Sequence, residues 1–170
     1  MRTVKVLSLL FVSLMLFQFY AVAPVANATP DSKLIPISGD VIISKGMQPL
    51  WPSHTSGNIT HIFAYQSATF SESLVGDVVV YWHISQNTET GEMKTVGLGT
   101  FTGTLTFNDT TKSGTFTFIT VGWGIGWTFY NEWRIIRGTD GLSHIHGKGT
   151  LDGDLSGYTG SYSGLVFFSP

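Results

Sequence analysis

Polar and apolar residues alternate along most of the chain after residue 28, and no segment there shows the spacing of an amphipathic helix. The alternation is clearest from Thr100 to Phe107, where threonines occupy one face and Phe101, Leu105 and Phe107 occupy the other. An apolar face opposite a threonine face predicts a half-buried strand of an antiparallel sheet. Strands of this kind are predicted over residues 40–44, 60–71, 78–87, 93–107, 114–125, 127–137, 142–155 and 160–168.

Short segments rich in glycine, asparagine, aspartate and threonine separate these strands. Such residues reverse the chain within a few positions, so consecutive strands are expected to lie side by side and antiparallel. About eight strands in this order suit closure into a barrel, which also removes exposed sheet edges. The predicted fold class is therefore all-β, an antiparallel meander that closes into an eight-stranded barrel.

A weak internal repeat indicates two similar hairpins. Residues 97–105 read Gly-Leu-Gly-Thr-Phe-Thr-Gly-Thr-Leu and residues 147–155 read Gly-Lys-Gly-Thr-Leu-Asp-Gly-Asp-Leu, so three glycines coincide at an offset of 50 positions. Glycine inside a long strand permits strong coiling or the close approach of another backbone. We therefore expect these glycines to serve packing rather than ligand binding.

The first 28 residues have the order of a secretory signal. Arg2 and Lys5 precede an apolar run over residues 6–25, and residues 26–28 (Ala-Asn-Ala) form a small-x-small cleavage site. We predict cleavage before Thr29 and a secreted or cell-surface location. The alternative is an uncleaved N-terminal anchor, because the run approaches the length of a membrane span. Residues 29–57 contain four prolines and are expected to form a lead-in that drapes over a barrel domain of residues 58–170.

Composition narrows the class of partner. Residues 29–170 carry seven basic and eleven acidic side chains, a net charge of −4, so neither nucleic acid nor an anionic lipid surface is expected to bind. The chain has no cysteine, so packing alone must stabilise an exported domain. Nothing resembles a phosphate-binding loop, a dinucleotide fingerprint or a nucleophile elbow, and no cofactor is predicted. Asn58 and Asn108 begin glycosylation sequons, and the oligomeric state is left open.

Glycine-containing motifs in the second half of the chain carry a family resemblance. Residues 138–142 read Gly-Thr-Asp-Gly-Leu, residues 145–153 read Ile-His-Gly-Lys-Gly-Thr-Leu-Asp-Gly, and residues 162–167 read Tyr-Ser-Gly-Leu-Val-Phe. Together with Gly-Thr-Phe-Thr-Gly at residues 99–103, this pattern resembles the allene oxide cyclase and dirigent-like barrels, most of all their uncharacterised bacterial members, over about residues 60–168. The resemblance implies an eight-stranded antiparallel, calycin-like barrel with an apolar lumen. It carries over no catalytic residue.

An aromatic cluster provides the candidate ligand-lining residues. If one side of the segment from residue 123 to residue 133 faces inward, it places three indoles, one phenyl ring and one amide in the lumen. An apolar wall with few polar groups is typical of a small-molecule pocket, but also of an ordinary core, and both interpretations stay open. The candidates are Trp123, Trp127, Phe129, Asn131 and Trp133.

Two further groups are candidates for chemistry. Glu132 is the acid inside a strongly apolar strand, and burial would raise its pKa and suit it to acid–base work; an outward orientation is favoured. His144 and His146 are two positions apart and would share one face of a strand, as metal ligands do. A third ligand would have to come from His61, His83 or Glu132. The strand pattern turns His144 and His146 outward, so no metal site is predicted.

Three functions follow, in order of preference. The first is a secreted or surface barrel without an assigned enzymatic role that holds a small apolar ligand in its lumen or serves a surface role. The second is a cyclase- or isomerase-type enzyme that steers an apolar substrate by shape. The third is a metal-binding barrel. The lumen separates the first two, because an open lumen with Asn131 or Glu132 inside favours binding or catalysis, whereas a filled one indicates a scaffold.

Overall fold

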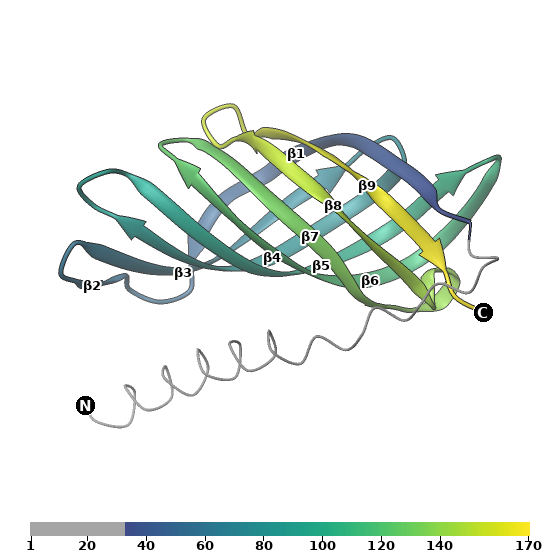
Figure 1. Cartoon of the computed structure of the whole chain (residues 1–170), viewed down its shortest axis with the longest axis horizontal. Helices are drawn as coiled ribbons and strands as arrows, with labels where there is room; N and C mark the ends of the chain where they lie inside the picture. Colours follow the sequence, from purple (N-terminus) through teal and green to yellow (C-terminus); the bar gives the residue numbers. More distant parts are fainter. Residues whose placement is uncertain (1–32) are drawn as a thin grey trace, which may run out of the picture. The chain divides into compact units, whose positions relative to one another are not determined.

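A computed structural model describes residues 33–170, and within them nine strands form one antiparallel sheet (Figure 1). Eight strands form a closed, barrel-like ring, because β1 pairs with both β9 and β3, whereas β2 pairs only with β3. The predicted all-β antiparallel meander is therefore confirmed. The elements are β1 (Ile35–Pro49), β2 (His54–Ser56), β3 (Ile59–Phe70), β4 (Leu74–Asn87), β5 (Glu92–Phe107), β6 (Thr110–Ile125), β7 (Thr128–Gly138), the 3₁₀ turn η1 (Asp140–Leu142), β8 (Ile145–Asp154) and β9 (Thr159–Phe168).

Strand β1 closes the ring, and this corrects the expected lead-in over residues 29–57. Its first half pairs with β9 from Ile35 to Ile42, and its second half pairs with β3 from Val41 to Pro49. Two register shifts after Ile43 bend the strand between its two partners. Pro36 and Pro49 lie near its two ends, where a missing amide disturbs the ladder least. The sequence therefore predicted only residues 40–44 of a 15-residue strand that belongs to the barrel wall.

The two faces of the wall follow the alternation in the sequence. Phe101 and Leu105 are fully buried, whereas Thr100 and Thr102 are exposed, so the predicted apolar and threonine faces of β5 are confirmed. On the inner face, aromatic rings from different strands pack closely. The ring centroids of Phe70 and Tyr162 are 4.8 Å apart, and those of Phe101 and Phe116 are 4.7 Å apart.

The repeated glycines make room for neighbouring groups. A Cβ atom at Gly99 would collide with the ring of Phe118, and one at Gly149 would collide with the indole of Trp133 and with backbone of β9. One at Gly103 would collide with backbone of β4. The space that a side chain would take is thus already filled, as the packing interpretation of the repeat predicts.

The element boundaries differ from the prediction in the second half of the chain. β7 begins at Thr128 rather than at Trp127, which lies in the preceding turn. β8 begins at Ile145, because residues 140–142 form η1 instead of strand. The predicted signal segment of residues 1–28 and its cleavage site before Thr29 lie outside the described residues. No helix within residues 33–170 is both long and apolar enough to span a membrane.

Candidate functional site in the barrel interior

The structure divides the predicted aromatic set between two faces. Asn131 and Trp133 are buried inside the ring, at 2% and 9% exposure. Phe129 is partly buried against the same core. Trp123 and Trp127 are 59% and 66% exposed, so the expectation that they face inward is wrong.

The β6–β7 turn explains the error. Ile125 pairs with Thr128, so Gly126 and Trp127 form a two-residue turn, with Gly126 at a φ of 60°. Across a two-residue turn, odd-numbered residues of one strand pair with even-numbered residues of the next, and paired residues point to the same face of the sheet. Trp123 therefore lies opposite Tyr130 on the outer face, with their ring centroids 6.3 Å apart.

Packing holds the indole of Trp133 in place. Its ring covers Gly149 on β8 and Gly164 on β9, where any Cβ atom would collide with it. Its Nε1 donates a hydrogen bond to the Thr150 carbonyl at 3.0 Å. The barrel strands therefore supply both the packing surface for the ring and the acceptor for its N–H group.

Asn131 belongs to a polar pair inside the ring. The Thr95 hydroxyl donates to Asn131 Oδ1 at 2.6 Å, and both residues are buried. Gly122 on β6 pairs with both of them in register, and its missing side chain leaves space for the amide. The sequence identified Asn131 but not Thr95.

Three other polar atoms in the interior have no hydrogen-bond partner among the described residues. They are Gln66 Nε2, Trp82 Nε1 and Thr120 Oγ1. Trp82 and Thr120 pair with Gly97 from its two sides, and a Cβ atom at Gly97 would lie 2.8 Å from each side chain. Gln66 lies on the neighbouring strand β3. It is two residues after Ala64, which pairs with Trp82, and both Ala64 and Gln66 are buried. None of the three residues was predicted from the sequence, although a polar residue at an inward position of an apolar strand is a readable signal.

The candidate acid and histidines lie outside this interior. Glu132 is exposed on the outer face, as favoured, and the burial on which its acid–base role depended is not present. His144 precedes β8 with a φ of 59° and is exposed. His146 stacks on Phe167 at 5.1 Å and lies 3.2 Å from the Ser169 hydroxyl. Across residues 33–170, no three His, Cys, Asp or Glu side chains are arranged to hold a metal ion.

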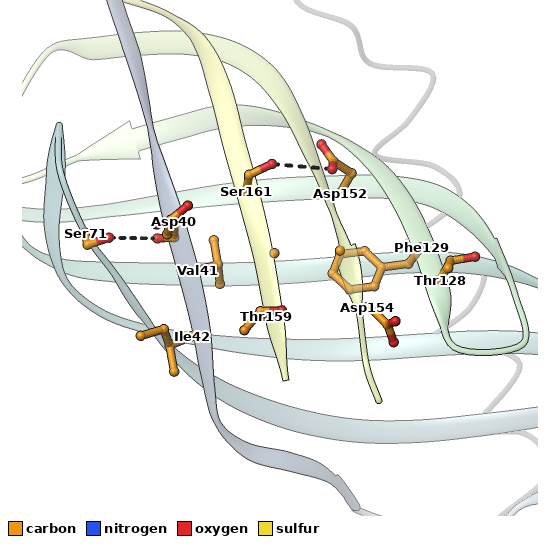
Figure 2. A pocket seen from close by; sticks show the side chains of 12 residues that line it. Asp40, Val41, Ile42, Ser71, Thr128, Phe129, Asp152, Asp154, Thr159 and Ser161 are labelled. Atoms are coloured by element: carbon orange, nitrogen blue, oxygen red, sulfur yellow. Dashed lines mark hydrogen bonds between the residues drawn. The ribbon is translucent and has the colours of Figure 1, made fainter. Parts of the chain in front are cut away.

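A separate open depression of about 740 Å³ lies where β1, β9, β8 and β7 adjoin (Figure 2). Asp40, Ser161 and Asp152 form a row across three strands, and the Ser161 hydroxyl donates to Asp152 at 3.4 Å. Hydrogen bonds from the side chain and backbone of Ser156 hold the pKa of Asp154, another lining residue, below its usual value. The depression shares Phe129 with the predicted set, but its carboxylates face solvent.

Comparison with known proteins supports the fold. No protein-family model matches the chain, and neither does any curated protein sequence. The barrel is similar to a crystal structure of a protein with unknown function from the DUF3224 family of Shewanella oneidensis MR-1. The two share 14% sequence identity with a TM-score of 0.65, over 81% of this chain and 99% of the other. At this identity the likeness shows the fold alone. The resemblance to allene oxide cyclase and dirigent-like barrels is supported only as far as an all-β barrel.

Proposed function

We propose that the protein is an exported barrel that binds a compact, uncharged small molecule in its interior. The observation that carries this proposal is the set of three buried polar atoms on Gln66, Trp82 and Thr120 without a protein partner. Buried polar atoms are nearly always hydrogen-bonded, and each one left alone costs about 1–3 kcal/mol. Three such atoms in one interior region favour an occupant that satisfies them, and because each has almost no accessible surface, the surrounding side chains must shift to admit it.

The chemistry of these atoms indicates what the occupant offers. Gln66 Nε2 and Trp82 Nε1 are donors, and the Thr120 hydroxyl can also donate. A carbonyl, ether or hydroxyl oxygen complements them. Among the described residues every buried polar side chain is uncharged, so an ionised ligand would lie in the interior without a counter-charge. A neutral molecule with an apolar body and an acceptor oxygen fits both conditions.

Native mass spectrometry of the protein purified from its own host tests the proposal. We expect the parent to retain a small molecule, and the variants Thr120→Val and Gln66→Met to retain less of it. In the ligand-free state both variants should unfold at the same or higher denaturant concentration, because each removes an unsatisfied buried group.

Thr95→Val is the matched control, because it makes the same chemical change at a buried threonine whose hydroxyl is already hydrogen-bonded to Asn131. It should lower the unfolding midpoint. The proposal is wrong if the parent carries no small molecule and Thr120→Val destabilises the protein as much as Thr95→Val does. That result would show that the barrel interior is a packed core that holds no ligand.

A further inference from the structure

Three of the five histidines lie together on the outer wall, far in sequence from His144 and His146. His54 on β2 is directly opposite His61 on β3, and His83 lies on the next strand, β4. Directly opposed residues of an antiparallel pair have Cβ atoms about 4.5–5.5 Å apart on one face. The ring nitrogens His61 Nδ1 and His83 Nε2 are 3.3 Å apart. Three imidazoles from three adjacent strands therefore occupy one patch.

The rings of His61 and His83 meet edge to edge. Their planes differ by 17° and their centroids are 5.5 Å apart. The centroid distance exceeds the nitrogen separation by about the width of one ring, so the two nitrogens lie on the facing edges of the rings. As the pair lies, one imidazole donates to the other, and which of them donates depends on the tautomer.

The surroundings restrict this pair. The ring of Phe63 stacks on His83 with centroids 4.5 Å apart, and Trp51 meets Phe63 edge-on at 5.7 Å. The Ser85 hydroxyl lies 3.2 Å from His61 Nδ1. The stacked Phe63 ring beside His83 and the hydroxyl beside His61 limit the orientations of both imidazoles.

We propose that His61 and His83 bind a divalent transition metal ion of the zinc, copper or nickel class, with His54 as the third ligand. Two nitrogens bound to zinc at 2.0–2.1 Å in a tetrahedral centre are separated by about 3.3–3.4 Å, which matches the pair. Imidazole is a preferred ligand of all three metals.

His54 completes the site by rotation. Its side chain is exposed and is not positioned as a third ligand in the structure, so it must turn about its own torsions toward His61. Water fills the remaining position, where the Ser85 hydroxyl can hydrogen-bond to it. This site lies on the outer wall and does not depend on the ligand proposed for the interior.

Calorimetric titration of the purified chain with zinc and copper salts tests the site. We expect one equivalent bound by the parent. His61→Gln or His83→Gln should weaken binding by more than the 10–100-fold that loss of a supporting partner typically costs. His54→Gln should weaken it less. The double variant His144→Gln/His146→Gln is the matched control, because it removes two imidazoles elsewhere, and it should bind as the parent does.

A second measurement needs no variant. In proton NMR spectra of the parent, substoichiometric copper should broaden the ring signals of His61 and His83 before those of His144 and His146. The proposal is overturned if the parent binds no metal at tens of micromolar. It is also overturned if the His144→Gln/His146→Gln variant loses the binding, or if copper broadens the His144 and His146 signals first. Absence of binding would show that the pair is only a hydrogen bond.

Discussion

The hydroxyl of Tyr162 on β9 accepts a hydrogen bond from the backbone amide of Leu74 at the start of β4, at 2.8 Å. The same hydroxyl donates to the Ser71 carbonyl, also at 2.8 Å. Gly39 on β1 lies between these groups, and any Cβ atom there would collide with the Ser71 carbonyl oxygen and the tyrosine ring. One side chain therefore links β9 to the β3–β4 connection across the strand that closes the barrel.

Tyr162→Phe should destabilise the fold. It leaves the Leu74 amide and the Ser71 carbonyl without their partner in a buried place, at a cost of about 1–3 kcal/mol. Urea unfolding measures the change. Tyr158→Phe is the control, because Tyr158 is 51% exposed and water can take over any hydrogen bond that its hydroxyl makes. Equal midpoints for Tyr162→Phe and the parent would contradict the structural role of this bridge.

The same residue predicts a loss of stability at high pH. Burial raises the pKa of Tyr162 from 10 to about 12, against the opposing effect of the Leu74 amide. The unfolded chain therefore releases this proton at lower pH than the folded chain does. The contribution of Tyr162 to the free energy of unfolding is fully present below pH 10 and is lost as the pH rises from 10 to about 12. Between pH 10 and about 12 the unfolding midpoint should fall further for the parent than for Tyr162→Phe. Equal falls would contradict a raised pKa of Tyr162 in the folded protein.

Two tryptophans on opposite faces should respond very differently to truncation. Trp133→Ala removes an indole packed on two glycines and should cost about 3–5 kcal/mol. Trp127→Ala changes an exposed turn residue and should stay within about 0.5 kcal/mol. Chemical denaturation of both variants checks the contrast. Comparable losses would mean that the Trp127 ring is also packed in solution.

The contact between Gly99 and Phe118 can be tested by rescue. The three atoms nearest to an added Cβ at Gly99 all belong to the Phe118 ring, so Gly99→Ala should overpack the core by about 1–3 kcal/mol. Adding Phe118→Leu shortens the obstructing ring and should recover part of this loss in a double-mutant cycle. Gly157→Ala is the control, because it lies in an exposed turn where an added Cβ would meet only the Thr159 hydroxyl at 3.3 Å and the Asp154 carbonyl at 4.0 Å. Strictly additive losses would show that the two positions are not coupled.

Export predicts a defined N-terminus. If residues 1–28 are a cleaved signal, N-terminal sequencing of protein from the culture medium should begin at Thr29, directly after the small-x-small site. A chain that retains Met1 and is recovered in a membrane fraction would instead support the anchored alternative.

Local pattern predicted the wall but not its closure. Period-two alternation is set by neighbouring residues, so strands such as β5 and the burial of Phe101 were readable from the sequence. The same reasoning placed Asn131 and Trp133 inward. It failed at Trp123, because the predicted strands left a single residue between them, whereas the turn has two residues and the inward parity changes across it. It also failed at β1, whose pairing with β3 and β9 is a long-range event.

The candidate sites depend on register between strands, which the sequence alone does not reveal. Trp82 and Thr120 meet at Gly97 beside the strand of Gln66, and residues 54, 61 and 83 share one patch of the outer wall, only because hydrogen bonds align five strands, β2 to β6, at particular offsets. The sequence determined by itself that the chain forms strands, and which face of most of them is apolar, because those preferences act between neighbouring residues. The tertiary structure decided which side chains meet, because a shift of one residue in register moves every side chain of a strand to the other face.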